Sequence, residues 1–194
     1  MDQKEVTVLN KEEILHHAIF RWWQISFKFR RFNGSETGEI KHYVLDRGDS
    51  VGMLLHHLSS DEIVLVEQLR IAALESKSPW LFEIPAGRVD PGEDPNSSAK
   101  REIREETGGR TTEVQLIGSF YLSPGGCSER LHLFYCPFPQ EMNLAATGGL
   151  AVENEDIKVH RISLRQALKM IRTGEIVDAK TVIALLWLNQ QEKN

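Results

Sequence analysis

Three scarcities in the sequence restrict what the chain can do: few cysteines, no basic excess and no long apolar run. Only Cys127 and Cys136 are present among 194 residues, and they do not form a CxxC pair. Two isolated cysteines favour free thiols in a reducing compartment over a disulfide framework or a zinc site. The net charge is −5, whereas proteins that bind nucleic-acid phosphates usually carry a basic surface. We therefore expect no nucleic-acid partner.

Features of exported or membrane proteins are also missing. The N-terminal stretch MDQKEVTVLNKEE is polar and acidic, unlike the apolar core of a signal peptide. No apolar stretch approaches the ~20 residues that span a bilayer. We expect a cytoplasmic protein with no membrane partner, and a length of 194 residues favours a single domain with a sizeable core.

What the chain does contain is a series of short runs with the composition of β-strands. These runs are rich in β-branched or aromatic residues and are mostly separated by polar or glycine-containing stretches. They lie at residues 41–45, 51–57, 63–69, 80–84, 114–122, 131–137 and 157–162. Before them, residues 1–15 have the composition of a short polar lead, and residues 19–32 form an aromatic-rich segment.

Three helices are expected, one between the strand runs and two at the end. Asp94 is a good N-cap, Pro95 suits the first helical position, and Gly108-Gly109 would end this helix. Ser163 opens a capping box and Asp178 caps the last helix. Many strands with one early and two late helices predict a mixed α/β sandwich.

The first helix carries a dense cluster of carboxylates. Glu102 and Glu106 are four residues apart and share a face, and Glu105 lies beside them. Like charges at this spacing repel, and a divalent cation such as Mg²⁺ accepts carboxylate oxygens as ligands. The cluster alone leaves two explanations open, a solvated acidic face or a cation site.

The residues around the cluster favour the cation site. Gly87, Glu93 and the run REIREETG at residues 101–108 follow the spacing G-x5-E-x7-R-E-U-x-E-E-x-G-U, in which U is a bulky aliphatic residue. This pattern resembles the box of the Nudix hydrolases. The one departure is Gly109 at the final aliphatic position, which packs and does not react.

The Nudix resemblance implies a fold, a reaction and a set of roles. The fold would be an α/β/α sandwich with a mixed β-sheet, in which the box forms a loop-helix-loop that binds Mg²⁺, with Mn²⁺ as an alternative. Water would attack a phosphorus of a nucleoside diphosphate linked to another group. The resemblance implies metal ligands at Glu102, Glu106 and the carbonyl of Ala86, with Glu105 close by and Arg101 holding the box carboxylates.

Segments outside the box resemble the ADP-ribose pyrophosphatase branch and its nucleotide-sugar relatives. The resemblance covers roughly residues 16–190 and is carried by residues 67–70, 79–87, 123–130 and 149–157. It implies that Glu153 is the general base and that Glu155 is a further metal ligand. It also places Arg70, Pro124 and Glu129 at the substrate.

Three further candidate substrate residues, Trp22, Trp23 and Lys180, also have a structural explanation. Trp22 and Trp23 point to opposite faces if they lie in a strand, so one of them could stack on a nucleobase while the other packs in a core or dimer contact. Lys180 matches a lysine that contacts substrate in the GDP-mannose-cleaving relatives, but it also suits a helix surface. The family resemblance further predicts a homodimer that exchanges N-terminal strands, with residues 1–35 as the dimer-forming segment and residues 36–194 as the Nudix hydrolase domain.

The leading hypothesis is Mg²⁺-dependent hydrolysis of a nucleoside diphosphate sugar, with ADP-ribose cut to AMP and ribose 5-phosphate. Cleavage of GDP-mannose or of many nucleotide sugars is the alternative. A module that binds ADP-ribose without cutting it is disfavoured, because such modules commonly lose box carboxylates and all are present here. An enzyme of RNA caps is disfavoured by the lack of a basic patch and by the SPGG stretch.

Overall fold

The computed structural model describes residues 5–76, 78–111, 113–138, 144–150 and 155–191. The chain forms two compact units, one of residues 1–48 and 121–129, the other of residues 49–120 and 130–194. The expected functional division into residues 1–35 and 36–194 stays a prediction. Within the described ranges, no helix is long and apolar enough to cross a membrane.

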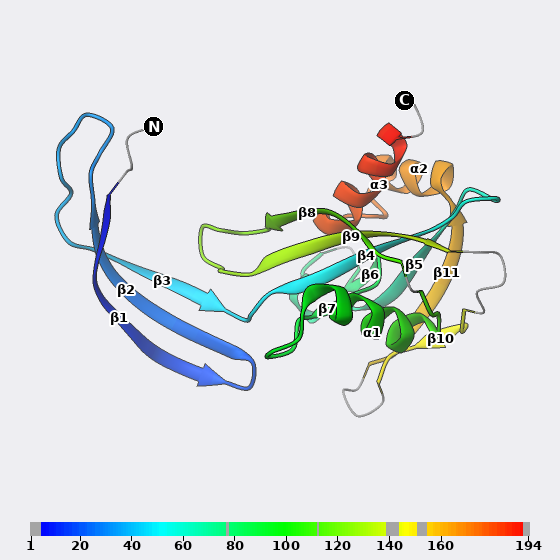
Figure 1. Ribbon diagram of the computed structural model, residues 1–194, viewed down its shortest axis with the longest axis horizontal. Helices are drawn as coiled ribbons and strands as arrows, with labels where there is room; N and C mark the ends of the chain where they lie inside the picture. The colour runs from blue at the N-terminus through cyan, green and yellow to red at the C-terminus, as the bar shows by residue number, and fades with distance from the viewer. Residues whose placement is uncertain (1–4, 77, 112, 139–143, 151–154, 192–194) are drawn as a thin grey trace. The chain divides into compact units, whose positions relative to one another are not determined.

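The N-terminal unit is built on a three-stranded antiparallel sheet of β1 (Val6–His17), β2 (Phe20–Phe29) and β3 (Ile40–Asp46) (Figure 1). The prediction of a polar lead over residues 1–15 was wrong, because most of that segment belongs to β1. Every residue of β1 is exposed, so the strand lacks the alternation of buried and exposed positions that reveals a strand in a sequence.

The larger unit contains an eight-stranded mixed sheet. Its main path runs β10-β11-β5-β4-β9-β8, with β6 paired to β5 and β7 paired to β4. The pairing of β4 with β9 is parallel, while β4 with β5 and β5 with β11 are antiparallel. The strands are β4 (Ser50–His57), β5 (Glu62–Leu69), β6 (Trp80–Glu83), β7 (Ala86–Arg88), β8 (Gln115–Tyr121), β9 (Arg130–Phe138), β10 (Thr147–Gly148) and β11 (Ile157–Ser163).

The helices are α1 (Pro95–Thr107), α2 (Leu164–Thr173) and α3 (Ala179–Gln191), with a short 3₁₀ helix η1 (Ile71–Ala73) after β5. Their predicted starts are confirmed. The side chain of Asp94 accepts hydrogen bonds from two backbone N–H groups of the first turn of α1, and Ser163 accepts one from Gln166. Gly108 ends α1 in the left-handed conformation, with φ 69°, which glycine adopts without strain.

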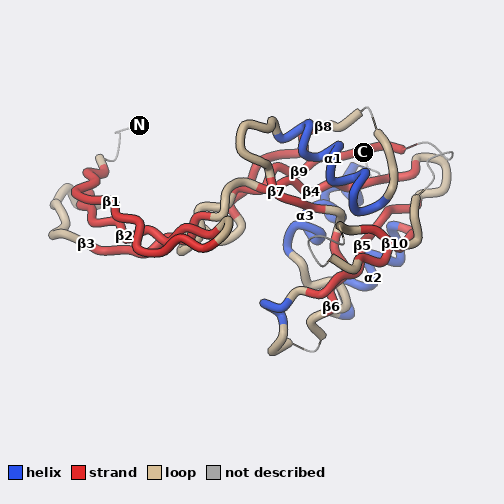
Figure 2. The backbone as a smooth tube through the Cα atoms, turned by 90° about the horizontal axis from the view of Figure 1, so that it is seen from below, coloured by secondary structure: helices blue, strands red, loops and turns tan. Residues whose placement is uncertain are grey.

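The sheet of the larger unit separates two hydrophobic cores. Leu54 of β4 packs into the core that α2 and α3 cover. Its neighbours Met53 and Leu55 face the other side, with Ala99 and Ile103 of α1. Figure 2 shows α1 on one side of the strands and α2 and α3 on the other. The predicted α/β/α sandwich with a mixed sheet is therefore confirmed.

Candidate active site

The acidic cluster of α1 lies against β7. Glu102 is largely buried, with 12% of its side chain exposed, and a Cβ atom on Gly87 would overlap its carboxyl group. The first glycine of the box is therefore needed because the Glu102 carboxylate occupies the space where any larger residue would place its side chain.

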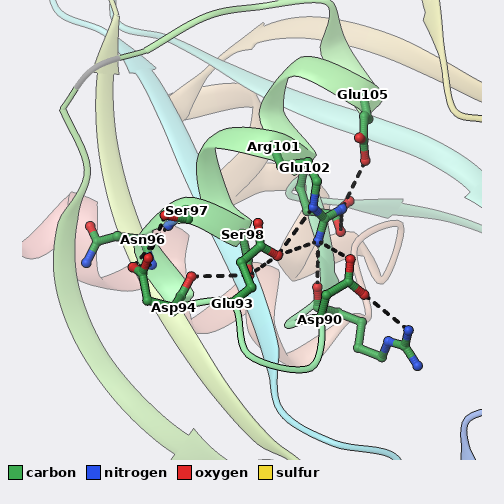
Figure 3. Close-up of polar contacts among 10 residues, drawn as sticks. Asp90, Glu93, Asp94, Asn96, Ser97, Ser98, Arg101, Glu102 and Glu105 are labelled. Atoms are coloured by element: carbon green, nitrogen blue, oxygen red, sulfur yellow. Dashed lines mark hydrogen bonds and ion pairs between the residues drawn. The ribbon is translucent and has the colours of Figure 1, made fainter.

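Arg101 connects the carboxylates on this face of α1 (Figure 3). Its Nη1 donates to Glu102 Oε1 at 2.8 Å and to Glu105 Oε2 at 3.0 Å. Its Nη2 donates to Glu93 Oε2 at 3.1 Å and to the carbonyl of Arg88 at 3.0 Å. The arrangement has the geometry expected of an arginine that holds box carboxylates in place, since a planar guanidinium can serve several oxygens at once.

Glu106 is the most deeply buried carboxylate of the cluster, with 3% of the residue exposed. Its Oε2 accepts a hydrogen bond from the backbone N–H of Ala86 at 2.9 Å. Burial, with repulsion from Glu102 and Glu155, raises the pKa of Glu106 to about 8. Burial also raises the pKa of Glu102 to about 7, with smaller contributions from Glu105 and Glu155. These groups hold negative charge at a free-energy cost that a nearby cation would offset.

The donor set fits a hard divalent cation. It consists of carboxylate oxygens that repel one another, which is the ligand chemistry of Mg²⁺ sites. Among the described residues, no three His, Cys, Asp or Glu side chains already close around one point. Arg101 binds Glu102 and Glu105, and the N–H of Ala86 binds Glu106. A cation would compete with these hydrogen bonds for the same oxygens.

The segment around β10 docks on the C-terminal end of α1. The N–H of Ala145 donates to the carbonyl of Thr107 at 2.8 Å, and the N–H of Gly149 donates to the carbonyl of Glu105 at 3.1 Å. A Cβ on Gly148 would overlap the carbonyl of Glu106. The segment therefore pairs carbonyls that a helix end leaves unbonded.

This docking brings Glu155 within electrostatic range of Glu102 and Glu106. The Oε2 atom of Glu155 accepts a hydrogen bond from the N–H of Leu150 at 3.2 Å. Glu153, the predicted general base, lies outside the described residues. The sequence did not predict that residues 145–149 dock on α1.

A second charged cluster in the same unit contains two of the predicted substrate residues, Arg70 and Lys180. Both bind the carboxylate of Glu83, which is 2% exposed. Three residues after Glu83, the N–H of Ala86 binds the Glu106 carboxylate, so a short stretch of chain joins this cluster to the acidic one. Glu83 was not among the predicted site residues, although a single carboxylate in the apolar run WLFEIP was a visible signal.

The other predicted substrate residues belong to the N-terminal unit. Trp22 is 38% exposed, while its neighbour Trp23 is half-buried and has the Nζ of Lys11 4.2 Å from its ring centroid. Pro124 lies in a turn of residues 123–126. Glu129 forms an ion pair with Arg47 at 3.6 Å. The substrate roles of these four residues stay predictions.

The fold and the box geometry define the class, and a match to the NUDIX domain covers residues 46–185. The chain belongs to the Nudix family, as the box predicted. It is 38% identical to the ADP-ribose pyrophosphatase of Escherichia coli strain K12 over 177 residues, or 91% of this chain and 84% of that protein. It is 37% identical to the GDP-mannose pyrophosphatase of Citrobacter koseri, over 97% of both chains.

A solved structure supports the same fold. The crystal structure described as an ADP compounds hydrolase superposes with a TM-score of 0.71, covering 97% of this chain and 95% of its own. The two sequences are only 19% identical, so the comparison concerns architecture alone. The predicted Nudix fold is confirmed.

Proposed function

We propose that the protein is a cytoplasmic, Mg²⁺-dependent enzyme that hydrolyses the diphosphate of a nucleoside diphosphate sugar, with ADP-ribose cut to AMP and ribose 5-phosphate. The observation that carries the proposal is the buried pair Glu102 and Glu106, whose raised pKa values mark a site that favours a cation. The relatives named ADP-ribose pyrophosphatase support the choice of substrate, and they favour catalysis over ligand sensing.

Glu102, Glu106, Glu155 and the carbonyl of Ala86 would hold the cation, with Mn²⁺ as an alternative to Mg²⁺. When bound, such a cation neutralises phosphate charge and lowers the pKa of a coordinated water. Arg101 keeps Glu102 and Glu105 oriented through its hydrogen bonds.

The remaining chemistry falls to residues outside the box. Arg70 binds phosphate oxygens, because its guanidinium is charged and partly exposed. Glu129, Pro124 and one of the two tryptophans, Trp22 or Trp23, contact the rest of the substrate. Glu153 accepts the proton of the attacking water, a task for which general bases typically contribute about 100- to 10,000-fold.

GDP-mannose is the alternative substrate. A relative named GDP-mannose pyrophosphatase is 37% identical to this chain over 97% of both chains. The relatives named ADP-ribose pyrophosphatase have nearly the same identity, 37% to 38%. Lys180 matches a lysine of those relatives, but here its Nζ binds Glu83 at 2.7 Å and Asp178 at 3.0 Å. The lysine therefore belongs to this buried cluster whichever nucleotide sugar is the substrate, and it does not decide between the two.

The N-terminal sheet supports a homodimer with exchanged N-terminal strands. Large apolar side chains are exposed along β1 and β2, including Val6, Val8, Leu15 and Phe20. A sheet that exposes so many apolar side chains fits an interaction surface, and a second copy of this chain is the partner we propose.

The test is a hydrolysis screen of nucleoside diphosphate sugars with Mg²⁺, followed by identification of the products by mass spectrometry. We expect ADP-ribose to be cut fastest and to give AMP and ribose 5-phosphate. Faster cleavage of GDP-mannose would select the alternative. Tight binding of ADP-ribose without products, at any concentration of Mg²⁺ or Mn²⁺, would contradict the enzymatic function.

A further inference from the structure

Glu83 is a buried carboxylate that two cations share. Its Oε1 accepts from Arg70 Nε at 3.0 Å, and its Oε2 accepts from Arg70 Nη2 at 2.8 Å. The same Oε2 accepts from Lys180 Nζ at 2.7 Å. The guanidinium and the ammonium group therefore lie side by side around one oxygen atom, at a distance where they would otherwise repel each other.

The fold fixes this carboxylate from three elements. Glu83 ends β6, Arg70 follows β5, and Lys180 lies in the first turn of α3. Asp178 accepts from Lys180 Nζ at 3.0 Å and from the N–H of Thr181 at 2.9 Å. The hydroxyl of Thr181 in turn accepts from the N–H of Ile84 at 2.8 Å. The start of α3 is thereby bonded to the chain directly after Glu83.

Both cations keep donors for another anion. Arg70 donates hydrogen bonds to Glu83 through Nε and Nη2, and no described residue accepts one from its Nη1. Its side chain is 40% exposed. Lys180 uses two of the three protons of its ammonium group on Glu83 and Asp178. The cluster holds two positive and two negative side chains, so it is neutral before a ligand arrives.

We propose that Glu83 is a positioning residue that holds Arg70 and Lys180 together, so that their remaining donors bind the diphosphate of the substrate. The inference rests on the proposed function and adds a residue that contacts no substrate atom. Three residues after Glu83, the N–H of Ala86 binds Oε2 of Glu106 at 2.9 Å, so a diphosphate bound here would lie near the acidic cluster of α1. Two adjacent cations suit a ligand with two adjacent anionic groups, whereas a single phosphate would form fewer charge-assisted hydrogen bonds with them.

The decisive variant is Glu83→Gln, which keeps the shape and removes the charge. An amide cannot neutralise two cations, and its own N–H₂ group faces one of them, so Arg70 and Lys180 should separate. We expect KM for ADP-ribose to rise at least ~10-fold, with kcat within about threefold and an unchanged Mg²⁺ requirement, because the lost interaction is made in ground state and transition state alike. Binding of ADP-ribose in EDTA, measured by calorimetry, should weaken by a similar factor, and binding of AMP should weaken less.

A double-mutant cycle separates positioning from a general loss of structure. Arg70→Ala should raise KM strongly in the wild-type background and only slightly in the Glu83→Gln background, because the arginine is already misplaced there. Glu83→Asp should restore part of the affinity. The matched control is Glu62→Gln on β5, which removes an ion pair with Arg161 and should leave KM unchanged.

Glu83→Gln leaves a buried cation without a counter-charge, so it could fail to fold. The double variant Glu83→Gln/Lys180→Met removes that cation and should fold, with weak binding of ADP-ribose retained. Wild-type affinity in any folded variant without the Glu83 charge, or additive effects in the cycle, would overturn the positioning role while leaving the enzymatic function intact. A wild-type protein that cuts no nucleoside diphosphate sugar would overturn both.

Discussion

The backbone of Gly87 lies so close to the carboxyl group of Glu102 that no side chain fits between them. Gly87→Ala should push Glu102 away from its place on α1. We expect turnover to fall at least ~10-fold and the Mg²⁺ concentration needed for half-maximal rate to rise. The matched control is Gly38→Ala, where a Cβ meets no atom within 4 Å. Normal Mg²⁺ dependence in Gly87→Ala would contradict the metal role of Glu102.

Glu106→Gln should lower activity and raise stability at once. The amide keeps an oxygen that can accept from the N–H of Ala86, but it removes a buried charge. We expect turnover to fall at least ~100-fold, which is about 2.7 kcal/mol of barrier. The melting temperature in EDTA at pH 8 should rise by about 3 °C or more, and Mg²⁺ should stabilise the variant less than the wild type. Near-normal turnover at saturating substrate and Mg²⁺ would remove Glu106 from the metal site.

The metal-free protein should lose stability as the pH rises. Glu102 and Glu106 have folded-state pKa values of about 7 and about 8, against 4.5 for an unperturbed glutamate. A raised carboxyl pKa means that the folded state holds protons that the unfolded state has released. The stabilisation is therefore complete below about pH 4.5 and is lost as the pH rises through 7 to 8.

Melting curves in EDTA between pH 5.5 and 8.5 measure this loss, which should reach about 3–6 °C. Excess Mg²⁺ should flatten the profile, and Glu106→Gln should reduce its slope. A wild-type profile in EDTA that is level, or that rises with pH, would show that these carboxylates are not destabilising when charged.

Glu153 and Glu155 should give different kinetic defects. Glu153→Gln removes the proposed base and should cut turnover about 100-fold or more, with substrate affinity and Mg²⁺ dependence nearly unchanged. Glu155→Gln removes a proposed ligand and should raise the Mg²⁺ concentration required. Titration of both variants against Mg²⁺ distinguishes the roles. Rescue of Glu153→Gln by extra Mg²⁺, without rescue of Glu155→Gln, would mean that the two roles are reversed.

The exposed apolar side chains of β1 should hold two copies of the chain together. Val6 and Val8 are 61% and 58% exposed, so Val6→Lys/Val8→Lys should leave each chain folded while it weakens the dimer. Sedimentation velocity should show a dimer for the wild type and a shift toward monomer, with lower activity, for the variant. A wild-type protein that sediments as a fully active monomer would contradict the exchange of strands.

The sequence was most informative where chemistry requires fixed spacing along one element. The box residues from Glu93 to Glu106 lie within a loop and one helix, so local geometry places them, and Asp94 and Gly108 mark the ends of that helix. Glu83 could not be assigned in this way, because its partners Arg70 and Lys180 are 13 and 97 residues away. Strand β1 was missed because a strand exposed along its whole length carries no burial pattern.

The parallel pairing of β4 with β9 has a consequence for how the protein folds. Ser50 pairs with Leu131, so roughly eighty residues, including the whole Nudix box, form a loop that this pairing closes. Closing such a loop costs entropy before its contacts form, and non-local pairing slows folding. We expect the helix α1 to gain its sheet-facing contacts only late in folding. Substitutions in β4 and β9 should therefore change the refolding rate more than substitutions within the box itself.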